Sequence, residues 1–307
     1  MSATASYALQ GGRVEPYVTV SEVKFSPTCA AIDFTNLIPN ASASVQDRAL
    51  QEIIVAASAK ADLYTMGIYG TLNATINTES GKYRPNRMGQ IIVNPYFTPI
   101  IEVRDFKIGY GPGVGLQDIT ITNDNCFVER EQFTITYSSS VGLSVGPLTI
   151  AGGNWAPQTQ LFCQWTYVNG WANTFTTTTT NAGDTSLQVT DPTGIYAGQS
   201  LSLWDGSNDE YVTVASTYDG VSKTIPLTAA LSFKHGSGVH LTALPATVKQ
   251  AVIHFVVALI KQRGQGGLVL NELGEPVPVS TKTLTSMEDE ALGYELLNDF
   301  RVAWARF

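Results

Sequence analysis

The chain has 307 residues, a length that suits two average domains, and a formal net charge of −8, with charged residues making up 14% of the sequence. Soluble domains usually contain about 25% charged residues, and an acidic chain without Lys or Arg clusters argues against tight binding to nucleic-acid phosphates. Thr, Ser, Asn and Gly take the place of the missing charges. We therefore expect much of the surface to be covered by further copies of the same protein.

The cysteines and the apolar stretches argue against a disulfide-stabilised, exported or membrane protein. Cys29, Cys126 and Cys163 are far apart and odd in number, so we expect reduced thiols in a cytoplasm rather than a disulfide framework. The start of the chain lacks the basic and apolar regions of a signal peptide. The most apolar stretch, 251–260, has about half of the ~20 residues that cross a bilayer. We expect neither export nor membrane insertion.

The N-terminal part predicts an arm followed by a helix. Residues 1–16 contain Gly11-Gly12 and Pro16, which is typical of a flexible arm. The segment 17–23, Tyr-Val-Thr-Val-Ser-Glu-Val, begins the ordered part. Apolar side chains at helical spacing predict an amphipathic helix over 45–64 with one buried face, and Ser44 and Asp47 form its expected capping box.

From about residue 70 to 243 the pattern changes to β. Short apolar or alternating runs lie between turn residues, and the stretch 171–243 contains enough of them for a compact β module of its own. Their spacing suits a small barrel or sandwich. The expected strands are 91–93, 99–103, 118–122, 133–137 and 162–167 before the module, and 186–189, 199–204, 210–214, 223–227 and 238–241 within it.

A second helix is expected over 245–263, with Pro245 at its first position and Gly264 at its C-terminal cap. It is apolar on every side except at His254, so it must be covered on every side. The other helices, the sheet and a neighbouring subunit are three possible covers. Its candidates for a subunit interface are Ile253, His254, Phe255 and Val257.

A last helix is expected over 287–306, with Ser286 and Asp289 as its capping box. Its end is rich in aromatic residues and arginine, which indicates either docking onto a partner or packing on the chain's own core. The candidate docking residues are Phe300, Arg301, Trp304, Arg306 and Phe307.

Together these elements predict an α+β fold, in which a small helical core (45–64, 245–263 and 287–306) carries a large, mostly β insertion. The expected domains are the arm 1–16, the first helix with the β region 17–170, the inserted β module 171–243, and the C-terminal helices 244–307.

Two sequence patterns are candidates for a catalytic or a metal-binding site. Gly142–Gly146 matches the G-x-S-x-G nucleophile elbow around Ser144, but the elbow needs a helix after it, and Pro147 with a strand-like run follows here. His235 and His240 lie near one strand and can approach each other, although their spacing matches no standard metal motif. We therefore expect no catalytic residue, no metal, no cofactor and no enzymatic activity.

The order of the elements resembles the head–tail adaptor (connector) proteins of tailed bacteriophages. The shared features are the Y-V-T-x-x-E-V opening at Tyr17–Val23, the amphipathic helix after it, a helix of the type Val248-Lys249-Gln250-Ala251…Ala258-Leu259-Ile260, and a closing helix that ends in aromatics and arginine. The resemblance covers residues 17–65 and 245–307. The chain departs from the usual adaptor in its length and in the nearly 180 mostly β residues between the first two helices.

The resemblance implies a structural virion protein at the phage neck, made in the host cytoplasm. Such adaptors form a ring, generally twelve-fold, that joins the portal protein to tail or head-completion proteins, and their C-terminal segment contacts the portal. DNA then passes through the lumen without specific binding, and an acidic ring suits this because it repels phosphates. Weak candidates for residues that face this lumen are Asp47, Glu52, Glu288 and Asp289. The alternative is a virion carbohydrate-binding or adhesion protein that uses the β module.

Overall fold

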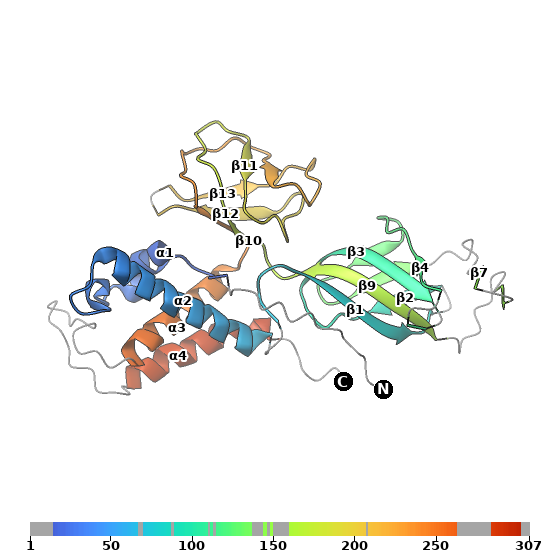
Figure 1. Cartoon of the computed structure of the whole chain (residues 1–307), viewed down its shortest axis with the longest axis horizontal. Coiled ribbons are helices and arrows are strands. Elements are labelled where there is room, and N and C mark those ends of the chain that lie inside the picture. Colours follow the sequence, from blue (N-terminus) through green and yellow to red (C-terminus); the bar gives the residue numbers. More distant parts are fainter. Residues whose placement is uncertain are drawn as a thin grey trace. The chain divides into compact units, whose positions relative to one another are not determined.

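The computed structural model of the chain (Figure 1) describes residues 15–66, 70–86, 89–109, 111–112, 115–136, 144–145, 148–149, 160–206, 208–262 and 284–301. Most of the expected arm lies outside the described residues, as do Gly264, Trp304, Arg306 and Phe307. The described part is a mixed α/β structure with four α-helices and several small antiparallel sheets. None of these helices is both long and apolar enough to cross a membrane.

The chain divides into two compact units. Ala74–Gly170 belongs to one of them, and Gly11–Asn73 together with Trp171–Phe307 forms the other. The second unit is therefore built from both ends of the chain. The first long helix folds in this unit together with the C-terminal helices, whereas we had expected it in one domain with residues up to 170.

The unit 74–170 is built from antiparallel strands. One sheet has the order β1-β9-β3-β4 and another has the order β2-β6-β5. Their apolar faces share one core, in which the ring of Phe133 lies 6.0 Å from that of Phe106 and 6.3 Å from that of Trp165. The strands are β1 (Thr75–Tyr83), β2 (Gln90–Val93), β3 (Ile100–Gly109), β4 (Gln117–Asp118), β5 (Cys126–Val128), β6 (Phe133–Thr136) and β9 (Leu161–Asn169), and a separate ribbon pairs β7 (Ser144–Val145) with β8 (Leu148–Thr149).

The strand predictions in this unit are partly confirmed. Strands occur at 91–93, 133–136 and 162–167, whereas the strand expected at 99–103 continues to Gly109 and the one expected at 118–122 is reduced to Gln117–Asp118. The long strand β1 was not predicted. Its sequence, Thr-Ile-Asn-Thr-Glu-Ser-Gly-Lys-Tyr, has no buried residue, so no apolar alternation marks it. Backbone pairing with β9 along its whole length holds it in the sheet.

The other unit contains the helices α1 (Val20–Phe25), α2 (Ala43–Thr65), α3 (Ala246–Gln262) and α4 (Leu284–Leu297), with three short 3-10 turns, η1 (Pro27–Cys29), η2 (Phe34–Asn36) and η4 (Asn298–Phe300). All three expected helices are present. The last one ends at Leu297 rather than at 306, because the chain tightens into η4 there.

Both predicted capping boxes are wrong. Helix α2 begins after Ser42, whose side chain makes no capping hydrogen bond, and α4 begins before Ser286. Each prediction used Asp at the third helical position, where the box requires the longer Glu or Gln to reach back to the cap. The capping box that the structure does contain lies at the start of α1, between Thr19 and Glu22.

Other helices of the same chain cover α3. Figure 1 shows α3 beside α2 and α4. Leu50 and Ile54 of α2 and Val252, Phe255 and Val256 of α3 are at most 1% exposed and share one core. Of the three possible covers for this apolar helix, neighbouring helices of the same chain therefore account for most of its surface.

The β module lies in the same unit. A four-stranded antiparallel sheet of order β10-β15-β12-β13 and a two-stranded sheet of β11 and β14 share an apolar core. None of the described sheets closes into a barrel. All five strands expected here are present, and only β10 was not predicted. The strands are β10 (Asn173–Phe175), β11 (Ser186–Gln188), β12 (Ser200–Trp204), β13 (Glu210–Thr213), β14 (Thr224–Pro226) and β15 (His240–Thr242).

We predict that Gly293→Ala destabilises the helical core. A Cβ atom at Gly293 of α4 would lie 2.5 Å from the fully buried ring of Phe255. Overpacking of this kind costs about 1–3 kcal/mol, which exceeds the ~1 kcal/mol that alanine gains over glycine in a helix. Urea denaturation should show a lower free energy of unfolding. The matched control, Glu295→Ala on the exposed face of the same helix, should change it little, and a stabilised Gly293→Ala protein would contradict the packing at this position.

Candidate functional site

A buried carboxylate lies in the first turn of α1. Thr19 caps this short helix, and the backbone N–H of Thr19 donates to Glu22 Oε2 at 2.6 Å while Glu22 N–H donates to Thr19 Oγ1 at 3.2 Å. This reciprocal capping box fixes the side chain of Glu22. Glu22 is only 8% exposed, so the carboxylate requires compensating partners.

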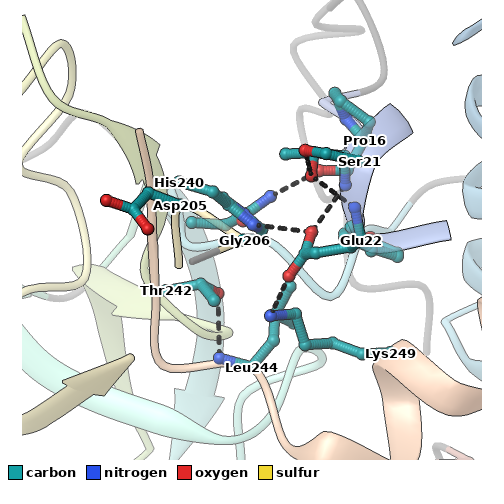
Figure 2. Close-up of polar contacts among 12 residues, drawn as sticks. Pro16, Ser21, Glu22, Asp205, Gly206, His240, Thr242, Leu244 and Lys249 are labelled. Carbon is teal, nitrogen blue, oxygen red and sulfur yellow. Dashed lines mark hydrogen bonds and ion pairs between the residues drawn. The ribbon is translucent and has the colours of Figure 1, made fainter. Parts of the chain in front are cut away.

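Two basic side chains from distant segments provide this compensation (Figure 2). His240 of β15 places Nδ1 3.1 Å from Glu22 Oε2, and Lys249 Nζ donates to Glu22 Oε1 from the first turn of α3. His240 is 1% exposed. The three side chains, here called the Glu22 cluster, connect α1, β15 and α3.

Both ring nitrogens of His240 face acceptors. Its Nε2 lies 2.5 Å from Asn173 Oδ1, and the Asn173 amide is oriented by its Nδ2, which donates to the carbonyl of Pro16 at 3.1 Å. The ring therefore bridges the Glu22 carboxylate and the side-chain amide of Asn173. The ring also stacks on Phe175, with centroids 5.2 Å apart.

The cluster keeps Glu22 ionised. Burial alone raises the pKa of a carboxyl group, but the hydrogen bond and charge of His240 and those of Lys249 outweigh it and lower the pKa of Glu22 to about 2. Glu22 therefore acts as a fixed negative charge at neutral pH rather than as a proton donor.

A pocket with a volume of about 440 Å³ opens beside the cluster. Its walls come from α1, β12, β13, the start of α3 and the link between β15 and α3. Phe25 and Tyr211 at the pocket are 72% and 81% exposed, and the rings of Phe25 and Trp204 lie 6.3 Å apart. The lining residues are Val18, Glu22, Phe25, Ser26, Ser200, Ser202, Trp204, Tyr211, Thr242, Ala243, Leu244, Ala246, Lys249, Gln250 and Ile253.

The two histidines expected near one strand have separate partners. His235, which is fully buried, lies between Asp205 Oδ2 at 2.8 Å and Glu210 Oε1 at 2.7 Å, whereas His240 belongs to the Glu22 cluster. Each ring therefore has its own set of hydrogen-bond partners. In the part of the chain that the structure describes, no group of three or more His, Cys, Asp or Glu side chains is arranged to hold a metal ion.

The sequence around Ser144 forms a hairpin. Ser144–Val145 pairs with Leu148–Thr149, so a strand follows the serine where a nucleophile elbow requires a helix. Among the cysteines, burial raises the pKa of Cys29 and of Cys163 to about 12. Both are protonated thiols at neutral pH, which makes them weak nucleophiles.

Two of the expected docking residues contact their own chain. The ring of Phe300 packs edge-on against Trp171 at 5.6 Å, and the Arg301 guanidinium lies 4.9 Å from the centre of the Tyr64 ring. Phe300 thus belongs to the edge of the helical core. Trp304, Arg306 and Phe307 lie outside the described residues.

The expected interface residues of α3 lie mostly in the core. Ile253, Phe255 and Val257 are 7%, 0% and 2% exposed in the single chain, and His254 Nδ1 lies 3.5 Å from Asp289 Oδ1 of α4. The prediction that these three apolar side chains form a subunit interface is therefore wrong, because α2 and α4 already cover the helix. Only Ile253 borders the pocket.

Most of the acidic candidates for a lumen are paired within the chain. Asp47 pairs with Lys24, Glu52 Oε1 lies 3.9 Å from Arg48, and Asp289 Oδ2 lies 2.6 Å from Lys261 Nζ. Glu288 is exposed. Glu295 of α4 and Asp299 of the following turn η4 are also exposed, and neither was predicted. The spacing of seven residues between Glu288 and Glu295 places these two on one face of α4.

No protein-family model matches the sequence, and no curated protein shows significant similarity to it.

The sequence analysis did not single out the Glu22 cluster or the pocket. The pattern Thr19-x-x-Glu22 is a visible capping-box signal, but nothing in the sequence links it to His240 or Lys249. Phe25, Trp204 and Tyr211 are isolated aromatics in the sequence, and only the fold brings them to one pocket.

We predict that Glu22→Gln lowers the free energy of unfolding by about 3 kcal/mol, because it leaves the half-buried Lys249 ammonium and the buried His240 ring without their carboxylate partner. Urea denaturation measures the difference. The matched control is Glu52→Gln, which removes an exposed i,i+4 pair and should have almost no effect. Equal effects of the two substitutions would show that the cluster adds nothing to stability.

The pH dependence gives an independent prediction. A carboxyl group whose pKa falls from 4.5 to about 2 on folding contributes stability that is fully present above pH 4.5 and is lost as the pH falls toward 2. The wild-type protein should therefore lose about 3 kcal/mol more than Glu22→Gln between these pH values. Unfolding curves at a series of pH values measure this difference, and parallel pH profiles for the two proteins would refute it.

Proposed function

We propose that this chain is a structural virion protein that forms a ring at the neck of a tailed phage, joins the portal to the tail and lets DNA pass. One observation carries the proposal. The two stretches that resemble head–tail adaptors, 17–65 and 245–307, are nearly 180 residues apart in sequence, yet their described parts fold together into one helical core of α1 to α4. The β module and the 74–170 unit are insertions into the connection between α2 and α3.

The distribution of charge supports this role. Residues 11–73 and 171–307 contain 19 acidic and 12 basic residues, whereas residues 74–170 contain 7 and 6. The unit that contains the helical core thus has a net charge of −7, of which its β module, residues 171–243, contributes −4 and its helical segments, 11–73 and 244–307, contribute −3. Glu288, Glu295 and Asp299 are exposed on α4 and its following turn. A ring repeats such a face in every copy, so a lumen formed by it would repel DNA phosphates.

Exposed apolar side chains on the long helices support contacts between copies. Val45 and Leu63 of α2 are 42% and 58% exposed, and Met287 and Leu292 of α4 are 62% and 46% exposed. In a ring of identical subunits each copy buries two different surfaces against its neighbours. Helices α2 and α4 each have exposed apolar residues, so each can contribute one of these two surfaces.

One observation favours the alternative role, carbohydrate binding by the β module. The pocket beside Trp204 and Tyr211 is lined by aromatic and hydroxyl-bearing residues. The two roles are compatible, since a neck protein can carry a binding module.

Native mass spectrometry of the purified protein tests the proposal. We expect a closed assembly of about twelve copies of the 33.0 kDa chain, or a smaller species that assembles into a ring when the portal protein of the same phage is added. A heterologous interface gives a closed ring when its rotation closes after a whole number of copies, and an open filament when it does not. A trimer, or a monomer that ignores the portal protein, contradicts the ring.

We predict that deletion of residues 302–307 abolishes portal binding and leaves the ring intact. The deletion keeps Phe300, which packs on Trp171, and Arg301, which lies over Tyr64, so the helical core is preserved. Co-sedimentation with portal rings measures the binding. A truncated protein that still binds portal rings would show that the docking assignment is wrong.

A further inference from the structure

The pocket beside the Glu22 cluster is built on a rigid base. Ser200, Ser202 and Trp204 alternate along β12, so they share one face of the strand, while Leu201 and Leu203 between them are fully buried in the module core. On the opposite wall, Gln250 donates to Thr28 Oγ1 at 2.7 Å. The β12 face and Gln250 are thus held in place before any ligand binds, which lowers the entropic cost of ordering these residues.

The lining combines aromatic rings with hydroxyl groups. Phe25, Trp204 and Tyr211 contribute the rings, and two of these, Phe25 and Tyr211, are largely exposed. The lining residues with aliphatic hydroxyl groups open to a ligand are Ser26, Ser200 and Ser202, whereas the hydroxyl of Thr242 already donates to the Ala172 carbonyl and accepts from Leu244 N–H. A ligand that fits this lining needs apolar faces for the rings and several hydrogen-bonding groups for the hydroxyls.

The charges in the lining neutralise each other. Glu22 and Lys249 are its two charged residues, and they form an ion pair in the wall. A charged ligand group would have to compete with that pair. An uncharged polar ligand leaves the pair intact.

A protein partner fits this composition less well. The buried centres of protein interfaces are depleted in serine, and binding hot spots rarely use Ser or Thr. A side chain of a partner placed here would bury the hydroxyls without enough hydrogen-bond partners, which is costly. A saccharide carries a hydroxyl group on most ring carbons and an apolar C–H face, and its size suits a pocket of about 440 Å³.

We propose that this pocket, between α1, the β12–β13 hairpin and α3, is a binding site for a neutral saccharide. Trp204 and Tyr211 stack on the C–H faces of the sugar, and Ser200 and Ser202 exchange hydrogen bonds with its hydroxyl groups. The Glu22–Lys249 ion pair holds α1 and α3 around the ligand.

The test uses the full-length protein and three neutral probes, maltotetraose, cellotetraose and chitotetraose. Saturation-transfer NMR detects contact, and tryptophan fluorescence follows a titration with each probe. We expect saturable binding of at least one probe. Tyr211→Ala and Trp204→Ala should each weaken it by about tenfold or more, through loss of one stacking ring.

Two features make the comparison decisive. Tyr211 is 81% exposed, so Tyr211→Ala removes a ring without disturbing the core even where Trp204→Ala alters the fold. Tyr196→Ala is the matched control, because Tyr196 is an exposed tyrosine of the same module, 48% accessible, that does not line the pocket. It should leave the affinity unchanged.

Three outcomes overturn the proposal. They are no saturable binding of any probe up to its solubility limit, equal affinity in wild type and Tyr211→Ala, and a change in assembly mass caused by Tyr211→Ala without any sugar binding. The last result would identify the pocket as a contact between proteins. The ring is judged separately by the mass of the wild-type assembly, so either idea can fail while the other stands.

Discussion

The Glu22 carboxylate is the constraint on which the helical and β parts of its unit both depend. A buried carboxylate without partners is too costly to persist, and this one is satisfied by the backbone of Thr19, by His240 and by Lys249. Because His240 lies in the last strand of the β module and Lys249 in the first turn of α3, the carboxylate fixes how the chain passes from module to helix. The pocket lies at this junction.

A second buried network fixes the other place where the chain enters and leaves the helical core. The Tyr17 hydroxyl donates to Asp62 of α2, and the backbone N–H of Leu72 donates to the same carboxylate oxygen at 2.9 Å. Burial, opposed by these hydrogen bonds, raises the pKa of Asp62 to about 6. The two networks thus anchor the segments just before α1, after α2 and before α3.

The sequence predicted the parts of this fold that have a strong local pattern. Helix α2 follows from apolar periodicity, α3 from an apolar stretch that begins at Pro245, and the module strands from turn residues at regular spacing. Strand β1 lacks that pattern, since pairing with β9 rather than burial holds it in place. The apolar surface of α3 suggested a neighbouring subunit, but α2 and α4 cover it. The Glu22 cluster was beyond prediction because its ion pairs span more than 200 residues.

The central claim is that identical copies surround a channel for DNA, and cryo-electron microscopy of the purified assembly tests it most directly. The account predicts a closed ring whose lumen is lined by acidic or neutral side chains, with Glu288, Glu295 and Asp299 of each copy facing the channel. A trimeric stalk without a channel, or a ring whose lumen is lined by lysine and arginine, would contradict it.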